Sequence, residues 1–372
     1  MNKSDNKLFF YLSMLCVFIS VNSSPINPSY LLGGILIFFI LLYMLSCLKI
    51  NKFTLVTMLC CIAFLASQIL GIRLVANYPE GPNYLTPLLF VYSILISTVV
   101  IETIQPIKYI HRLAIYKKVY NVAVFFLVIE LISRILNYNS NKDGFYALKY
   151  SVLYFDSNFT GLVILALCSF LLYLKYVKLY DLKQQRRILY VLLIATFSRA
   201  AIVAMIVTRI GLANPKKVKS RSYIMLACAA VIFSMMAVEY IYQSESFSDI
   251  DGSFNSKFYI INQALALYDK LPFMVHLFGI GLGNTSQFLG IFAHNMYVTL
   301  ILEMGWFGTT LFVLYIIYTL RISNGYAMYI WLPVFISGIS LFSAYSPFIF
   351  IIVSLISCEN MKVKENYNEY TS

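Results

Sequence analysis

Residues 30–48 read YLLGGILIFFILLYMLSCL, a run without a single charged side chain. A second run of this kind, LTPLLFVYSILISTVV, covers residues 85–100. A helix needs about 20 apolar residues to cross a hydrocarbon core of about 30 Å. Because these runs are nearly continuous, they predict membrane-spanning helices rather than the alternating pattern of membrane β-strands.

The composition of the whole chain agrees with this interpretation. Apolar residues make up 60% and charged residues 12% of the 372 residues, and the mean hydropathy is +0.78. Soluble globular chains carry about 25% charged residues. Lipid can accept this much apolar surface, provided that the backbone is hydrogen-bonded internally. We therefore expect an all-α, polytopic integral membrane protein in which residues 1–372 form a single membrane domain.

The formal net charge is +12, and its distribution predicts the orientation. The Lys and Arg residues gather between apolar runs, as they do at the cytoplasmic ends of membrane helices. This favours membrane lipid as a partner and argues against nucleic acid. Lys3 and Lys7 place the N-terminus in the cytoplasm, before a first, uncleaved span. Spans are expected at about 8–22, 30–48, 53–72, 84–103, 119–137, 152–174, 223–242, 295–320, 328–343 and 346–357, with basic cytoplasmic loops at 108–118 and 175–187.

Residues 188–210 need a separate interpretation, because Ser198-Arg199 interrupts them. As one span, they would put the basic residues 216–221 outside, against the positive-inside rule. An arginine at the bilayer centre also costs about 2.5–3.5 kcal/mol on insertion scales. We predict two short, tilted helices that turn at Ser198-Arg199 near the outer surface. The expected total is then about 11–12 transmembrane helices.

The longest polar stretch, residues 243–294, is expected to be a large periplasmic loop. Its Asp249-Ile250-Asp251 matches the short DxD pattern of metal-dependent sugar-nucleotide transferases, but the following Gly252-Ser253 favours a simple turn. The glycines of residues 279–283 lack the spacing of a dinucleotide fingerprint and predict a backbone bend. The seven cysteines form no CxxC pair, and we expect neither a disulfide framework nor a metal site.

Three polar places could carry chemistry near the outer face. Arg199 could hold a phosphate through two parallel hydrogen bonds, or could be an interfacial arginine that snorkels to water. His294, beside Asn295, could act as a general base, although a lone histidine is often structural. Glu130 and Arg134 lie one helical turn apart and are expected to pair. Alternatively, Arg134 could add a second phosphate contact.

Several motifs, in order, resemble the O-antigen polymerase and ligase superfamily over residues 150–320. Ser157 stands where the family has proline. The motifs are Asp156-Ser157-Asn158-Phe159, Thr196-Phe197-Ser198-Arg199, the glycines 279, 281 and 283, His294-Asn295-Met296-Tyr297, and residues 303–308 (EMGWFG).

The resemblance implies a multi-pass protein of the bacterial inner membrane. It implies inverting glycosyl transfer from an undecaprenyl-pyrophosphate-linked oligosaccharide, without metal, nucleotide or other cofactor, and a chain-length regulator protein as a partner. Arg199 would contact the pyrophosphate and His294 would activate the acceptor hydroxyl. Ser198, Asn295 and Asn158 would contribute to substrate binding.

One position departs from the family pattern. Lys257 stands where ligase-like members often carry an arginine, and lysine cannot make the planar bidentate contact. The second phosphate-binding role could therefore fall to Lys257, Arg134 or Lys270.

Three functions remain open. A polymerase joining oligosaccharide repeat units is favoured over a ligase that transfers the glycan to lipid A–core, because polymerases vary greatly in sequence. A lipid-linked oligosaccharide flippase is the third possibility. Transporters often carry internal repeats. This chain shows none, and its polar residues gather towards one face.

Overall fold

The chain is described here by a computed structural model, which defines residues 3–16, 27–47, 50–138, 148–151, 154–214, 261, 263–290, 295–339 and 346–371. Within these residues, six helices are long and apolar enough to cross a membrane. The protein is therefore a multi-pass membrane protein, as the hydropathy predicts. The six helices are α2 (Pro28–Cys47), α3 (Lys52–Leu74), α4 (Leu85–Ile104), α5 (Tyr109–Leu136), α6 (Ser157–Tyr176) and α14 (Gly305–Ile322).

The other helices of the described residues are shorter or less apolar. They are α1 (Lys3–Leu15), α7 (Lys183–Ala195), α8 (Arg199–Gly211), α11 (Phe273–Phe278), α12 (Thr285–Leu289), α13 (Met296–Val298), the π-helical turn η4 (Thr299–Glu303), α15 (Met328–Ser337) and α16 (Pro347–Thr371). The expected total of 11–12 spans stays a prediction. The span predicted at 223–242 and most of the predicted loop 243–294, including Asp249-Ile250-Asp251, lie outside the described residues.

Both basic loops differ from the prediction. The loop predicted at 175–187 covers only residues 177–182, because α6 runs to Tyr176 and α7 begins at Lys183. Residues 109–118 are not a loop, because α5 begins at Tyr109 and runs without a break to Leu136. No proline or glycine interrupts this stretch. Its buried side chains recur at helical spacing, with Arg112, Tyr116 and Tyr120 on one face. At 28 residues the helix is about 42 Å long, so it extends beyond a hydrocarbon core of about 30 Å.

The span predicted at 295–320 is also not one regular helix. It is divided into α13, η4 and α14, and the division falls at Gly305, whose φ is +65°. A β-carbon on Gly305 would lie 2.3 Å from the backbone nitrogen of Gly279. Two stretches of backbone therefore touch where the helix is interrupted, and only glycine permits that approach.

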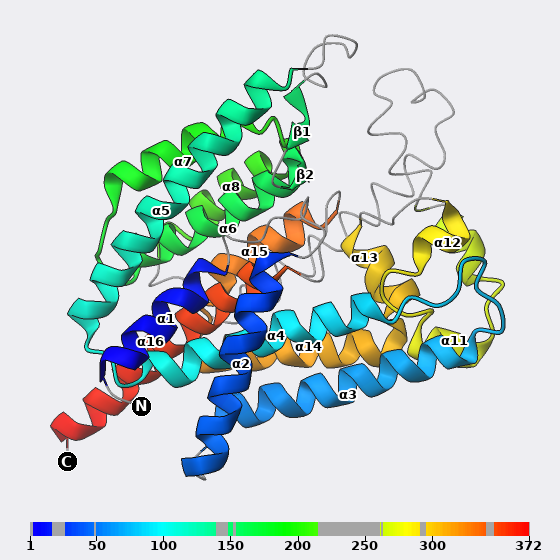
Figure 1. Ribbon diagram of the computed structural model, residues 1–372, viewed down its shortest axis with the longest axis horizontal. Helices are drawn as coiled ribbons and strands as arrows, with labels where there is room; N and C mark the ends of the chain where they lie inside the picture. Colours follow the sequence, from blue (N-terminus) through cyan, green and yellow to red (C-terminus); the bar gives the residue numbers. More distant parts are fainter. Residues whose placement is uncertain are drawn as a thin grey trace.

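The helices form two groups that share α16. Around α4 pack α1, α2, α3 and α16, whereas α6 packs with α7, α8, α15 and α16. Figure 1 shows the N- and C-termini at one end of the molecule, whereas the β1–β2 hairpin, α11 and α12 lie towards the opposite end. The two-residue strands β1 (Tyr150–Ser151) and β2 (Phe155–Asp156) pair antiparallel just before α6. The end away from the termini therefore carries the candidate site described next.

Candidate active site at the turn between α7 and α8

The predicted break at Ser198-Arg199 is confirmed. Helix α7 ends at Ala195 and α8 begins at Arg199, leaving a connection of Thr196, Phe197 and Ser198. Phe197 has a φ of +54°, in the left-handed region that costs a non-glycine residue about 1–2 kcal/mol. Strain of this kind persists where the surroundings enforce it, and it gathers at functional sites.

The turn is held by hydrogen bonds to the last carbonyls of α7. The hydroxyl of Thr196 donates to Leu193 O at 2.7 Å, and the amide of Phe197 donates to Ile194 O at 3.0 Å. These bonds satisfy carbonyls that a helix end leaves without an intrahelical partner. The reversal is thus fixed by local contacts.

The two helices that flank the turn are short. Each has 13 residues, which rise about 20 Å. A hydrocarbon core is about 30 Å thick. Neither helix alone is therefore long enough to cross such a core.

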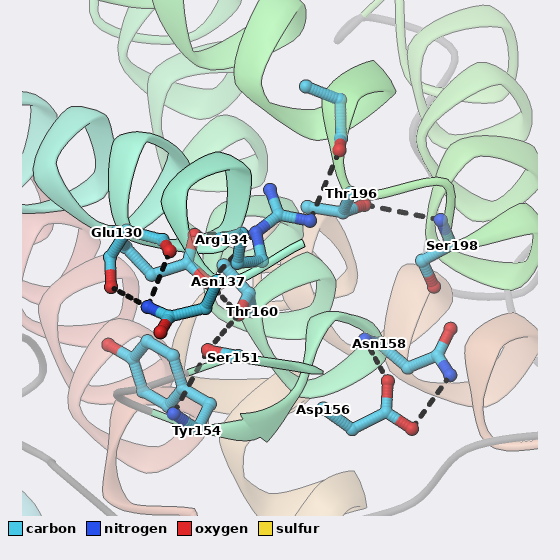
Figure 2. Close-up of polar contacts among 12 residues, drawn as sticks. Glu130, Arg134, Asn137, Ser151, Tyr154, Asp156, Asn158, Thr160, Thr196 and Ser198 are labelled. Atoms are coloured by element: carbon cyan, nitrogen blue, oxygen red, sulfur yellow. Dashed lines mark hydrogen bonds and ion pairs between the residues drawn. The ribbon is translucent and has the colours of Figure 1, made fainter. Parts of the chain in front are cut away.

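A buried ion pair lies against this turn. Nε of Arg134 lies 3.0 Å from Oε1 and 3.2 Å from Oε2 of Glu130, one helical turn away, as the spacing predicts. Both side chains are at most 2% exposed. Nη1 of Arg134 also donates to Ala195 O at 3.2 Å (Figure 2), so the ion pair ties the end of α5 to the end of α7.

The carboxylate of Glu130 also reaches α6. The hydroxyl of Thr160 lies 3.2 Å from Oε1 of Glu130 and 3.2 Å from the hydroxyl of Ser151. Ser151 in turn accepts the amide of Tyr154 at 3.1 Å, which closes the β1–β2 hairpin. Figure 2 shows the ion pair, the hairpin and the turn around one polar region.

The second turn of α6 lies directly against Ser198. A β-carbon placed on Gly161 would lie 2.9 Å from Cβ and 3.2 Å from Oγ of Ser198. Small residues allow membrane helices to approach this closely. One turn earlier, the amide of Asn158 donates to the Asp156 carboxylate at 2.8 Å, so Asp156 caps α6. Figure 2 shows Asn158 and Ser198 on the same side of the polar region.

Two buried hydroxyls of this region have no hydrogen-bond partner within the described structure. They belong to Ser157, the first residue of α6, and to Ser198, the N-cap residue of α8. A buried polar group without a partner costs about 1–3 kcal/mol and calls for an explanation. The N-terminus of α8 also has no side-chain cap, and the side chain of Arg199 there is exposed.

The electrostatics of the region follow from these positions. The charges of Glu130 and Arg134 offset each other, and Asp156 opposes the positive end of α6. The positive end of α8 instead lies beside a second positive charge, that of Arg199. Backbone N–H groups and the helix dipole make such a helix start suited to anions.

Four predicted site residues thus belong to one region: Arg199, Ser198, Asn158 and Arg134. Asn295 lies elsewhere, as the N-cap of α13. Its Oδ1 accepts the amides of Tyr297 and Val298, and its Nδ2 donates to Ile339 O at 2.7 Å. His294 and Lys257 lie outside the described residues, so their predicted roles stay predictions.

The glycines 279, 281 and 283 confirm the predicted backbone bend, with φ values of +78°, +83° and +80°. The amides of Ile280 and Gly281 donate to Leu302 O and Glu303 O. Gln68 of α3 accepts the amide of Leu282 at 2.8 Å. The bend therefore docks on η4 and α3.

Sequence reasoning missed Thr160 and Gly161, which lie against Glu130 and Ser198. Gly161 follows soon after the Asp156–Phe159 motif, and a small residue in a membrane helix indicates a close contact with another helix. Among the described residues, no three His, Cys, Asp or Glu side chains gather as a metal site. Comparison of the chain with protein-family models and with curated proteins gives no match.

Proposed function

We propose that this protein is an O-antigen polymerase. It joins undecaprenyl-pyrophosphate-linked oligosaccharide repeat units by glycosyl transfer at the periplasmic face of a bacterial inner membrane. One observation carries the proposal. The uncapped, positive start of α8, with the exposed Arg199 and the unpartnered hydroxyl of Ser198, lies against the start of α6 at the far end of a membrane protein.

The chemistry of the donor matches these groups. When the glycosidic bond forms, the bond to pyrophosphate breaks and negative charge grows on the leaving oxygen. Arg199 can hold two pyrophosphate oxygens with its planar guanidinium, and the Ser198 hydroxyl can donate to a third. Groups fixed where charge develops stabilise the transition state more than the ground state.

The depth of the turn suits a lipid-linked donor. The undecaprenyl chain stays among the acyl chains, so the pyrophosphate reaches the protein from the side, near the membrane surface. We place the turn at that level, because helices of about 20 Å reach one surface of the membrane and cannot cross the whole core. Arg134 is buried and bonded to Glu130 and Ala195 O, so we assign it a positioning role for the turn.

The acceptor hydroxyl must lose a proton as it attacks. We assign this step to His294, on the basis of the resemblance, and a positioned base accelerates it by about 10²–10⁴-fold. Asn295 fixes the start of the helix that follows His294. Asn158 is proposed to contact the sugar, and Lys257 is proposed to contact the second phosphate. A chain-length regulator protein is the proposed partner.

A gel separation of lipopolysaccharide from a strain lacking the gene tests the proposal. Core bearing a single repeat unit, with the longer ladder lost, is the expected result. Absence of O-chain with accumulation of long lipid-linked chains would instead identify the ligase. An unchanged ladder would overturn both and favour a transporter.

A further inference from the structure

The short helix α11 (Phe273–Phe278) exposes apolar side chains outside the candidate spans. Phe273 is 75% and Met274 53% exposed, whereas Val275 beside them is buried. Large apolar side chains that are exposed together need a partner surface.

The position of α11 is fixed by a backbone contact with the end of α3 and a ring contact with the start of α14. A β-carbon on Gly71, near the end of α3, would lie 2.6 Å from Phe278 O. The ring of Phe278 lies 5.8 Å from the ring of Phe307, in the first turn of α14. Helix α11 therefore lies level with the ends of α3 and α14, which Figure 1 also shows.

Tyr268 contacts both Trp306 of α14 and His276 of α11. Nε1 of Trp306 donates to the Tyr268 hydroxyl at 2.8 Å, and Nε2 of His276 lies 2.7 Å from Tyr268 O. The rings of Tyr268 and His276 stack with centroids 4.0 Å apart. Trp306 nevertheless remains 56% exposed. Amphipathic rings of this kind gather at the boundary between acyl chains and headgroups.

The two spans that α11 contacts also expose apolar side chains. Such a surface on membrane-spanning helices faces acyl chains. The exposed apolar residues of the two spans include Leu59, Ile62, Ile69, Leu70, Leu314 and Ile317. Just before α11, the side chain of Lys270 is exposed.

We propose that α11 is an interfacial anchor, which lies in the lipid layer between the acyl chains and the headgroups. Phe273 and Met274 insert below the headgroups, and Lys270 faces the lipid phosphates. The anchor holds the glycine bend at the membrane surface. The proposal does not depend on the glycan chemistry.

Tryptophan fluorescence in vesicles tests this placement, because the chain has only two tryptophans and Trp331 is fully buried. The first measurement compares the full chain with Trp306→Phe and so isolates the emission of Trp306. The second places Phe273→Trp in the Trp306→Phe background, with Glu80→Trp in the same background as a control from another exposed loop. Each protein is reconstituted with phosphatidylcholine brominated near the glycerol end or near the methyl end of the acyl chain.

The anchor predicts that tryptophan at 306 and at 273 loses more emission to bromine near the glycerol end than to bromine near the methyl end. Both resist quenching by iodide in the water, whereas tryptophan at 80 is quenched by iodide. Quenching at 306 and 273 by iodide and by neither lipid overturns the proposal. Stronger quenching by bromine near the methyl end also overturns it, because α11 would then lie within the hydrocarbon. Trp331 serves as an internal signal that the protein is folded.

Discussion

Helix α5 carries a buried arginine towards each end, and their surroundings differ. At the end near the termini, Arg112 places Nε 2.7 Å and Nη2 2.9 Å from the two oxygens of Glu359 in α16. The Tyr116 hydroxyl donates to the same carboxylate at 2.7 Å. At the opposite end, the Arg134 contacts are longer, at 3.0–3.2 Å.

The difference indicates that the Arg112 cluster has a structural role, whereas the Arg134 cluster belongs to a candidate binding site. The cluster of Arg112 is a bidentate fork, which combines strength with fixed geometry. It joins α5 to α16, and the guanidinium and the carboxylate are held by short hydrogen bonds. The cluster of Arg134 lies beside buried hydroxyls, those of Ser157 and Ser198, for which the described structure holds no partner. We therefore assign stability to the first cluster and ligand binding to the second region.

Arg199→Ala gives the largest expected effect. We expect chain extension in cells to fall about 10²–10³-fold, the cost of removing one group that stabilises transition-state charge. Protein accumulation in the membrane stays unchanged, because the side chain is exposed. The measurement is the glycan ladder together with the amount of protein.

Arg209→Ala is the matched control, since Arg209 is exposed in the last turn of the same helix. It leaves the ladder intact. Equal losses from both variants would remove the reason for placing the site at the start of α8.

The two arginine pairs are compared by stability. Arg112→Ala leaves Glu359 buried without its cation, which costs about 3–5 kcal/mol. Arg134→Ala costs less, because its contacts are longer, but it also lowers activity by releasing Ala195. Thermal unfolding in detergent, followed by circular dichroism, measures both. A larger loss of stability for Arg134→Ala than for Arg112→Ala would contradict the structural role assigned to the Arg112 cluster.

A pair of hydroxyl deletions sharpens the same contrast. Tyr116→Phe removes a hydrogen bond to a carboxylate and destabilises by about 1.5–3 kcal/mol. Ser198→Ala removes a buried hydroxyl that has no partner within the described residues, so the free energy of unfolding does not fall. Chain extension behaves in the opposite way, slowing for Ser198→Ala and not for Tyr116→Phe at a temperature where both are folded. Normal chain extension by Ser198→Ala would mean that this hydroxyl does not bind the donor.

The smallest effect belongs to a partly exposed ion pair. Arg186 lies 2.8 Å from Asp181, and its hydrogen bonds hold the pKa of Asp181 below the usual value. The stabilisation is therefore present above the unfolded pKa of about 3.9 and is lost as the pH falls through the folded pKa. Asp181→Asn costs about 0.2–1 kcal/mol near neutral pH. Unfolding curves of both proteins converge at low pH, and a difference that persists there would mean that charge is not the cause.

Some features of the fold could be predicted because their cause is local. The uninterrupted apolar runs predicted the bounds of α2, α3, α4 and α6 to within a few residues. The cost of Arg199 in lipid, with the positive-inside rule, gave the break between α7 and α8. The spacing of Glu130 and Arg134 gave their ion pair. Each of these follows from neighbours in the chain.

Other features depend on partners far away in the sequence. From the sequence, Arg112 is predicted to be one cation of a cytoplasmic loop. It is instead buried in an ion pair with Glu359, which lies 247 residues away in the sequence. The division of 295–320 follows from the contact of Gly305 with Gly279. The polar region around Ser198 needs α5, α6 and the turn together. Arg199, Ser198, Asn158 and Arg134 could be singled out from the sequence, but the buried, unpartnered hydroxyls could not.

The most direct test of the central claim uses the purified protein in vesicles with a labelled undecaprenyl-pyrophosphate-linked repeat unit. The proposal predicts longer lipid-linked chains and release of undecaprenyl pyrophosphate with the wild type and Arg209→Ala, and neither with Arg199→Ala. If the wild type forms no longer chain but moves the donor across the membrane, the protein is a transporter and the account is contradicted.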